Sequence, residues 1–195
     1  MIKINNVLFM ENKNMTFAFS NYTELKDRLE EVYNIFGCKK NVYVYIYDNV
    51  EALSRTLEWE LPIWVKGVSY YNRIYLIEKD GWYEKTGESM LDILMHEYIH
   101  TLVSFTFKSK CPIWLNEGLA MICAGQHAIS CDGEIVDNYP YYEVDYSDNN
   151  LYVQSYYIVN KLIEKIGLKE LVFYAKKCQD FRGDYILGEE ALKLL

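Results

Sequence analysis

The sequence predicts an α+β fold, in which an N-terminal half mixes helices with a small sheet and a C-terminal half is helical. β-branched and aromatic runs such as Val42–Tyr47 indicate strands before residue 78, whereas the patterns after residue 88 are helical. A length of 195 residues suffices for one domain with a substantial core. We therefore expect a single domain over 1–195, with an α/β subdomain over about 1–107, a helical subdomain over about 108–195 and a cleft between them.

The N-terminal half contains two predicted helices and three predicted strands. Leu25, Leu29, Val32 and Phe36 recur at helical spacing, and Gly37 follows them as a stop signal. In chain order we expect a helix over 22–36, a strand over 41–47, a helix over 48–57, and strands over 63–68 and 73–77. The last strand is either the sheet edge to which a peptide adds or a plain structural strand.

The C-terminal half is predicted to be helical around one long loop. Ser89 and Asp92 are spaced as a capping box, Pro112 suits a first helical turn, and Gly167 suits a helix end. The expected helices cover about 88–107, 112–126, 151–166, 168–179 and 187–194. The polar and aromatic loop 127–150, with a turn signal at Asp132-Gly133, either lines a substrate cleft, covers it as a lid or fills surface.

The segment His96-Glu97-Tyr98-Ile99-His100 has the spacing of a metal site. Two histidines four residues apart project from one face of a helix, so both imidazoles can reach one ion, and Glu97 can take a proton from a water on that ion. A catalytic zinc needs a third protein ligand and one open position. Glu117 is the candidate, because the 16 residues between His100 and Glu117 allow a turn and a returning antiparallel helix.

The alternative is a pair of surface histidines on an ordinary helix. Apolar residues cover nearly every face of the helix over 88–107, which predicts that it is buried, and buried histidines and carboxylates need partners or a metal. These residues are Met90, Leu91, Ile93, Leu94, Met95, Ile99, Leu102, Val103 and Phe105. The motif therefore favours a zinc-dependent hydrolase, most readily a peptidase, with one zinc ion per chain.

Together with the later segment Trp114–Ala120 (WLNEGLA), the motif resembles the gluzincin metallopeptidases, and among them the aminopeptidase N-like group and its small peptidase MA-like relatives. The resemblance covers about residues 63–180. It implies a zincin-like fold, zinc on His96, His100 and Glu117, and Glu97 as general base. It also implies a tyrosine that stabilises the oxyanion from the start of a later helix. Tyr152 occupies that position, Tyr156 is the alternative one turn on, and ordinary aromatic packing is the alternative for both.

Two departures from the family bear on activity. The aminopeptidases carry a Gly-x-Met-Glu-Asn segment whose Glu binds the free amino group of the substrate, and the corresponding Gly67–Asn72 contains no Glu. An endopeptidase is therefore favoured over an aminopeptidase. Met121 stands where thermolysin-like enzymes have an Asp that orients a histidine, so the outer support of the metal site must come from elsewhere.

Two other functions use the same residues. One is a non-catalytic, zinc-bearing module that binds peptides or regulates a partner, against which the intact Glu97 argues. The other is a zinc hydrolase of a non-peptide bond. Substrate panels separate these from the favoured peptidase, whose partner is a peptide or protein substrate.

Charge and cysteine usage limit partners and location. A net charge of -8 with no long basic run argues against nucleic acid, and no stretch has the apolar length of a membrane span. No signal peptide is visible, so a cytoplasmic location is expected. Five irregularly spaced cysteines fit free thiols in a reducing compartment. A second metal site built from Cys111, Cys123, Cys131 and His127 is the disfavoured alternative.

Overall fold

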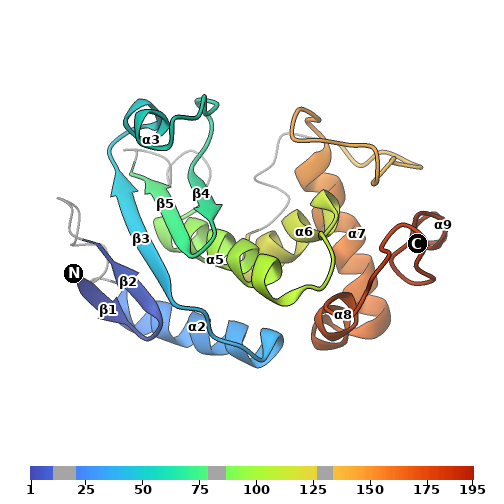
Figure 1. Cartoon of the computed structure of the whole chain (residues 1–195). Helices are drawn as coiled ribbons and strands as arrows, with labels where there is room; N and C mark the ends of the chain where they lie inside the picture. The colour runs from blue at the N-terminus through green and yellow to red at the C-terminus, as the bar shows by residue number, and fades with distance from the viewer. Residues whose placement is uncertain (11–20, 79–86, 127–133) are drawn as a thin grey trace. The chain divides into compact units, whose positions relative to one another are not determined.

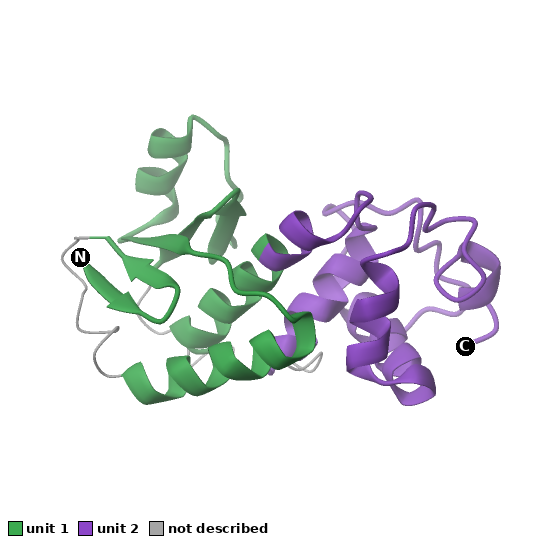
Figure 2. Ribbon diagram, turned by 60° about the horizontal axis from the view of Figure 1, so that its bottom comes forward, with its two compact units in different colours: residues 1–101 green, residues 102–195 purple. Residues whose placement is uncertain are grey.

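The computed structural model describes residues 1–10, 21–78, 87–126 and 134–195 (Figure 1). Over these residues it has an α+β fold with one mixed sheet of five strands and seven helices, which confirms the predicted fold class. The chain divides into two compact units, Met1–Thr101 and Leu102–Leu195 (Figure 2). No helix among the described residues combines the length and apolarity needed to cross a lipid bilayer.

The sheet belongs to the first unit. Its strands are β1 (Ile2–Ile4), β2 (Val7–Phe9), β3 (Val42–Tyr47), β4 (Gly67–Tyr70) and β5 (Arg73–Ile77), in the spatial order β1-β2-β3-β5-β4. The central strands β2, β3 and β5 are parallel, and β1 and β4 pair antiparallel at the two edges. Alternate residues of β3 are buried, as expected for a strand with one face on a core.

Three features of this sheet differ from the sequence-based expectation. The strands β1 and β2 were not expected, because three residues are too few to show an alternating pattern. The strand expected over 63–68 shares only Gly67 and Val68 with β4, since the Val65 N–H donates to the Pro62 carbonyl at 3.0 Å and forms a turn there. The strand β5 lies between β3 and β4, so β4 forms this edge and β5 is a structural strand, the second of the two alternatives.

Two helices of the first unit form as their sequences predict. The helix α2 (Tyr22–Phe36) buries its apolar stripe and ends at Gly37, which adopts a φ of 63°. The helix α3 (Val50–Leu57) is capped by Asn49, whose side chain accepts the Ala52 N–H at 2.8 Å. It packs against β3 and β5, where Leu53 and Val65 are buried in a small apolar cluster with Tyr75 and Ile77.

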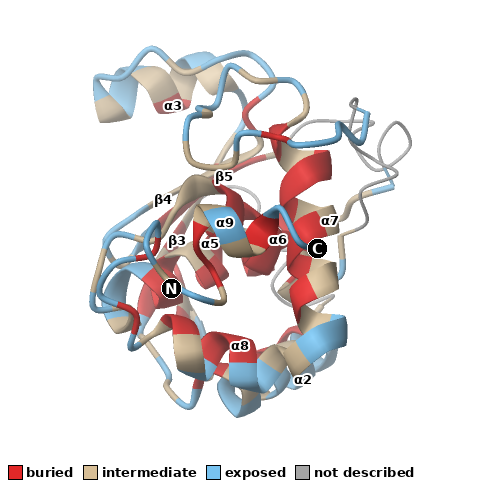
Figure 3. Cartoon of the chain, turned by 90° about the vertical axis from the view of Figure 1, so that its right-hand side faces the viewer, coloured by how far each residue is buried: buried red, intermediate tan, exposed pale blue. Residues whose placement is uncertain are grey.

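The second unit is built on α6 (Ile113–Cys123), α7 (Leu151–Ile166), α8 (Leu168–Ala175) and α9 (Glu189–Leu192). Seven of the 11 residues of α6 and seven of the 16 residues of α7 are buried, and the two helices pack along one another (Figure 3). The helices α8 and α9 are shorter than the expected 168–179 and 187–194. The N–H groups of Lys177 and Cys178 bond three residues back and end α8. Asp184 accepts the N–H groups of Ile186 and Leu187 in a turn before α9.

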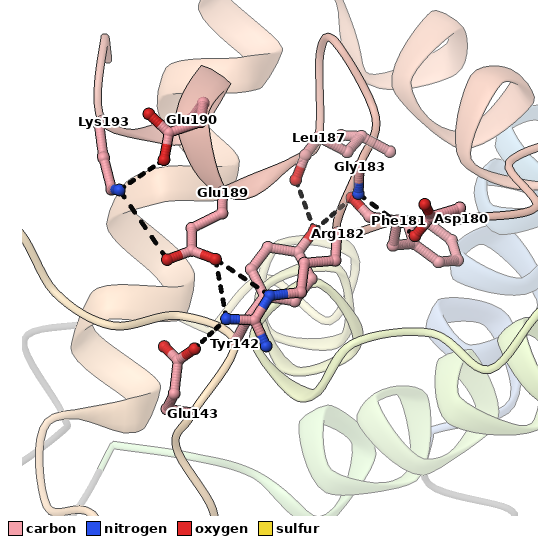
Figure 4. A network of polar contacts seen from close by, with 10 residues as sticks. All are labelled: Tyr142, Glu143, Asp180, Phe181, Arg182, Gly183, Leu187, Glu189, Glu190 and Lys193. Atoms are coloured by element: carbon pink, nitrogen blue, oxygen red, sulfur yellow. Dashed lines mark hydrogen bonds and ion pairs between the residues drawn. The ribbon is translucent and has the colours of Figure 1, made fainter.

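Residues 134–150, which we name the tyrosine loop, connect to α7 and are tied to the rest of the second unit. The Tyr142 hydroxyl lies 2.8 Å from the Phe181 carbonyl and 2.6 Å from the Leu187 carbonyl (Figure 4). Arg182 pairs with both Glu143 and Glu189 beside them. The turn expected at Asp132-Gly133 lies outside the described residues. The tyrosine loop is therefore anchored by side chains although it has no regular structure.

Candidate metal centre

The two histidines lie on α5 (Met90–Thr106), which begins with the predicted capping box. The Ser89 N–H donates to Asp92 Oδ2 at 2.7 Å, and the Asp92 N–H donates to Ser89 Oγ at 3.1 Å. Arg28 of α2 also donates to Asp92 Oδ1 at 2.7 Å. These bonds fix the start of the helix one to two turns before His96.

Tyr98, inside the motif, packs the middle of α5 against the rest of the first unit. Its side chain is 2% exposed, and its hydroxyl accepts a hydrogen bond from Asn6 Nδ2 at 2.7 Å. Burial is the main cause of its raised pKa, which the hydrogen bonds with Lys40 and Asn6 partly offset. Because Tyr98 faces the core, the histidines on either side of it in sequence are turned to another face of the helix.

His96 and His100 point their Nε2 atoms at one another. These atoms are 3.0 Å apart, the ring planes are nearly perpendicular at 87°, and both residues are half-buried. Two nitrogens bound at about 2.0–2.1 Å to one tetrahedral zinc lie about 3.3 Å from each other. The observed separation is therefore close to what a shared ion requires. Two neutral imidazoles at this distance can share only one hydrogen bond, whereas a cation satisfies both lone pairs.

Glu117 lies on α6 and is 2% exposed. Its neighbour Gly118 explains how α6 packs at this point. A Cβ atom at Gly118 would lie 2.4 Å from the Ser155 carbonyl oxygen and 2.5 Å from Val159 Cγ2, both on α7. Only glycine permits this approach, so the sequence Glu117-Gly118 combines a buried carboxylate with a close helix contact.

The structure brings the three predicted ligands together. One ligand atom from each of His96, His100 and Glu117 lies within 4.8 Å of the other two. Two imidazole nitrogens and one carboxylate form a donor set typical of catalytic zinc, and a tetrahedral ion on three protein ligands keeps a fourth position open. The three side chains therefore fit a divalent metal ion.

Glu97 is buried next to the edge strand of its own unit. The residue is 7% exposed, and a Cβ at Gly67 of β4 would lie 2.9 Å from Glu97 Cγ and 3.0 Å from Glu97 Oε1. The main chain of β4 thus passes directly beside the Glu97 carboxylate. A strand with a larger residue at this position would displace that carboxylate.

Tyr146 contacts the site although the sequence did not indicate it. Its hydroxyl donates to Glu117 Oε1 at 2.9 Å from the tyrosine loop. The two tyrosines that the resemblance indicated, Tyr152 and Tyr156, lie half-buried in the first two turns of α7. No spacing rule singles out one loop tyrosine among the 19 in the chain, so Tyr146 could not be identified from the sequence.

The four cysteines in the described residues are free, as expected. Burial raises the pKa of Cys123 to about 12, and burial together with the charge of Glu117 raises the pKa of Cys111 well above its ordinary 9.0. Both are therefore protonated thiols at neutral pH, which makes them poor nucleophiles. The alternative cysteine-rich metal site includes Cys131 and His127, which lie outside the described residues.

No protein-family model matches the chain, and the curated proteins give no match either. The function has to be inferred from the side chains themselves. Three metal-ligand side chains and a buried carboxylate one residue from the first ligand are the groups from which the chemistry follows.

Proposed function

We propose that this chain is a zinc-dependent hydrolase of the gluzincin type that cleaves peptide bonds, with endopeptidase cleavage favoured. The observation that carries the proposal is the convergence of His96, His100 and Glu117, whose ligand atoms lie within 4.8 Å of one another. A buried Glu97 adjoins the first of these ligands. Structural metal sites are closed by four protein ligands, so three ligands beside an acidic group fit catalysis better than a purely structural role.

The chain supplies most of the catalytic groups that hydrolysis needs. A zinc ion bound here would lower the pKa of water toward 7 and polarise the scissile carbonyl. Glu97 would accept the proton of the attacking water and deliver it to the leaving amine. Tyr152 is the residue that the family resemblance assigns to hydrogen bonding of the oxyanion, with Tyr156 as the alternative.

The edge strand β4 offers a way to bind an extended peptide. The Ile77 N–H donates to the Lys66 carbonyl at 2.9 Å, which makes these two residues a hydrogen-bonded pair of the antiparallel ladder. Pairs alternate along such a ladder, so the main-chain groups of Gly67 and Ser69 point away from β5. A peptide that adds to this edge would bond with Gly67, whose main chain passes beside Glu97.

The absence of an acidic side chain in Gly67–Asn72 bears on the mode of cleavage. A free amino terminus is bound tightly only where a carboxylate pairs with it. The outward main-chain groups of β4 bond equally well with the interior of a peptide. Peptides with blocked amino termini should therefore be cleaved, whereas aminoacyl reporter substrates should not.

The test is Glu97→Gln, which keeps the shape of the side chain and removes its basicity. The metal ligands are untouched, so zinc content should match wild type, while cleavage of a blocked, fluorescence-quenched peptide library should fall by about 10²–10⁴-fold. Glu170→Gln on the exposed surface of α8 is the matched control and should retain full turnover.

Each other outcome points to a different function. Cleavage by Glu97→Gln at the wild-type rate would contradict the proposed role of Glu97. A wild-type protein that binds zinc and peptides but cleaves none would favour the peptide-binding module. Turnover of ester or amide reporters without peptide cleavage would favour a hydrolase of another bond.

A further inference from the structure

The carboxylate ligand of the proposed metal centre, Glu117, needs support from neighbouring groups. Metal-bound side chains are normally held by hydrogen bonds from outer groups, which fix the ligand atom in place before the ion arrives. Glu117 is almost fully buried, at 2% exposure, so its carboxylate needs such a donor in any state of the protein. The Tyr146 hydroxyl is such a donor.

We propose that Tyr146 is a positioning residue of the metal centre, which orients Glu117 through its phenol hydroxyl. This inference rests on the proposed function, because it assigns a role toward the same metal ion. The hydroxyl donates to Glu117 Oε1 at 2.9 Å, a normal length for a hydrogen bond to a carboxylate. This bond would hold the carboxylate in one orientation when a metal ion binds.

Binding through one carboxylate oxygen matters for the chemistry. A carboxylate that binds zinc with both oxygens occupies two positions, whereas a catalytic site needs one position open. A hydrogen bond from Tyr146 to one oxygen of Glu117 would disfavour coordination of an ion by both oxygens.

The tyrosine loop holds Tyr146 on both sides. Asp145 Oδ1 accepts the Ser147 N–H at 2.8 Å and the Ser147 hydroxyl at 2.6 Å, which closes a turn around Tyr146. These same bonds lower the pKa of Asp145, so the turn is formed with an ionised carboxylate at neutral pH. At the start of the loop, the Glu134 N–H donates to Asn150 Oδ1 at 2.9 Å.

Hydrogen bonds of Gln154 connect the tyrosine loop to α7. Gln154 is 0% exposed, and its Nε2 donates to the Glu134 carbonyl at 3.1 Å. Its Oε1 accepts the Tyr141 hydroxyl at 3.3 Å. Since α7 also packs against Gly118 next to Glu117, one helix fixes both partners of the Tyr146–Glu117 bond. Contacts within the second unit therefore hold both residues of the Tyr146–Glu117 hydrogen bond in place.

The experiment measures zinc affinity in the full chain, by competition with a chromogenic zinc chelator. Tyr146→Phe removes the hydroxyl and keeps the ring, so the apo protein should still fold, with an unfolding temperature lowered only by the loss of one hydrogen bond to the buried carboxylate. Its dissociation constant for zinc should rise by about 10–100-fold. Tyr22→Phe is the matched control, because Tyr22 is also 50% exposed, and it should bind zinc as wild type does.

A double-mutant cycle separates positioning from a general structural effect. Tyr146 acts through Glu117, so adding Tyr146→Phe to Glu117→Ala should change the residual zinc affinity by less than about twofold. Equal weakening in both backgrounds would overturn the inference, and so would a Tyr146→Phe protein with wild-type affinity. A wild-type chain that takes up no zinc would overturn the proposed function and this inference with it. That outcome is seen in the wild-type measurement alone, so it is distinguished from a failure of the Tyr146 inference.

Discussion

Replacement of Gly118 by alanine tests the packing that places Glu117. The added Cβ would lie 2.4 Å from the Ser155 carbonyl oxygen, 1.0 Å short of the 3.4 Å at which ordinary contact begins. It would also lie 2.5 Å from Val159 Cγ2 and 2.9 Å from Val159 Cβ. The Ser155 oxygen is main chain of a helix and cannot rotate away, so α6 and α7 must separate.

The expected magnitude follows from two opposing effects. Overpacking of a core costs about 1–3 kcal/mol, and a clash with main chain belongs at the upper end of that range. Alanine is the better helix former by about 1 kcal/mol, which offsets part of the loss. We expect a net loss of about 2 kcal/mol in the free energy of unfolding, or roughly 4–8 °C in Tm for a chain of this size.

The assay is urea unfolding of Gly118→Ala beside wild type and Gly37→Ala. A Cβ at Gly37 meets nothing within 4 Å, so the cost there comes only from its φ of 63° and should be about 1 kcal/mol. A Gly118→Ala protein as stable as wild type would refute the reasoning. The close approach of α6 to α7, and with it the argument for the position of Glu117, would then fail.

Two further predictions concern the Glu97 carboxylate and the Cys123 thiol. Gly67→Ala places a Cβ 2.9 Å from Glu97 Cγ, and since that side chain is flexible it should move aside. Stability should change by less than about 1 kcal/mol and zinc content not at all, while peptide turnover falls by about 10²-fold. Unchanged turnover would contradict the proximity of β4 to Glu97. Burial raises the pKa of Cys123 from 9.0 to about 12, so the unfolded chain loses this proton first. Stability is therefore fully present below pH 9 and should decline above it by about 1 kcal/mol per pH unit. In urea unfolding between about pH 9 and 11, Cys123→Ala should flatten that decline, and an identical slope would argue against a desolvated thiol.

Local patterns in the sequence predicted much of the fold and the ligand set. The capping box at Ser89 and Asp92 and the apolar stripe of α2 are set by neighbours within four residues, and both form as expected. The same holds for His96 and His100, whose spacing alone places them on one helix face. Such features depend on helix geometry, which the sequence encodes directly.

Features that depend on distant segments could not be predicted. The strands β1 and β2 are too short to show a period, and they exist because they pair with each other and with β3. The strand β4 covers Gly67–Tyr70 instead of the expected 63–68 because these residues pair with β5. The bond from Tyr146 to Glu117 joins residues 29 positions apart through an irregular loop, and no local pattern encodes such a contact.

The most direct test of the central claim is zinc stoichiometry by native mass spectrometry, with affinity from chelator competition, on wild type, Glu117→Ala and His127→Ala. His127 is the chain's third histidine and lies outside the motif, so its variant is the matched control. The account predicts one zinc per chain in wild type and in His127→Ala, and zinc binding that is lost or strongly weakened in Glu117→Ala. Wild type without zinc, or Glu117→Ala with unchanged affinity, would contradict the proposal that His96, His100 and Glu117 form the metal centre.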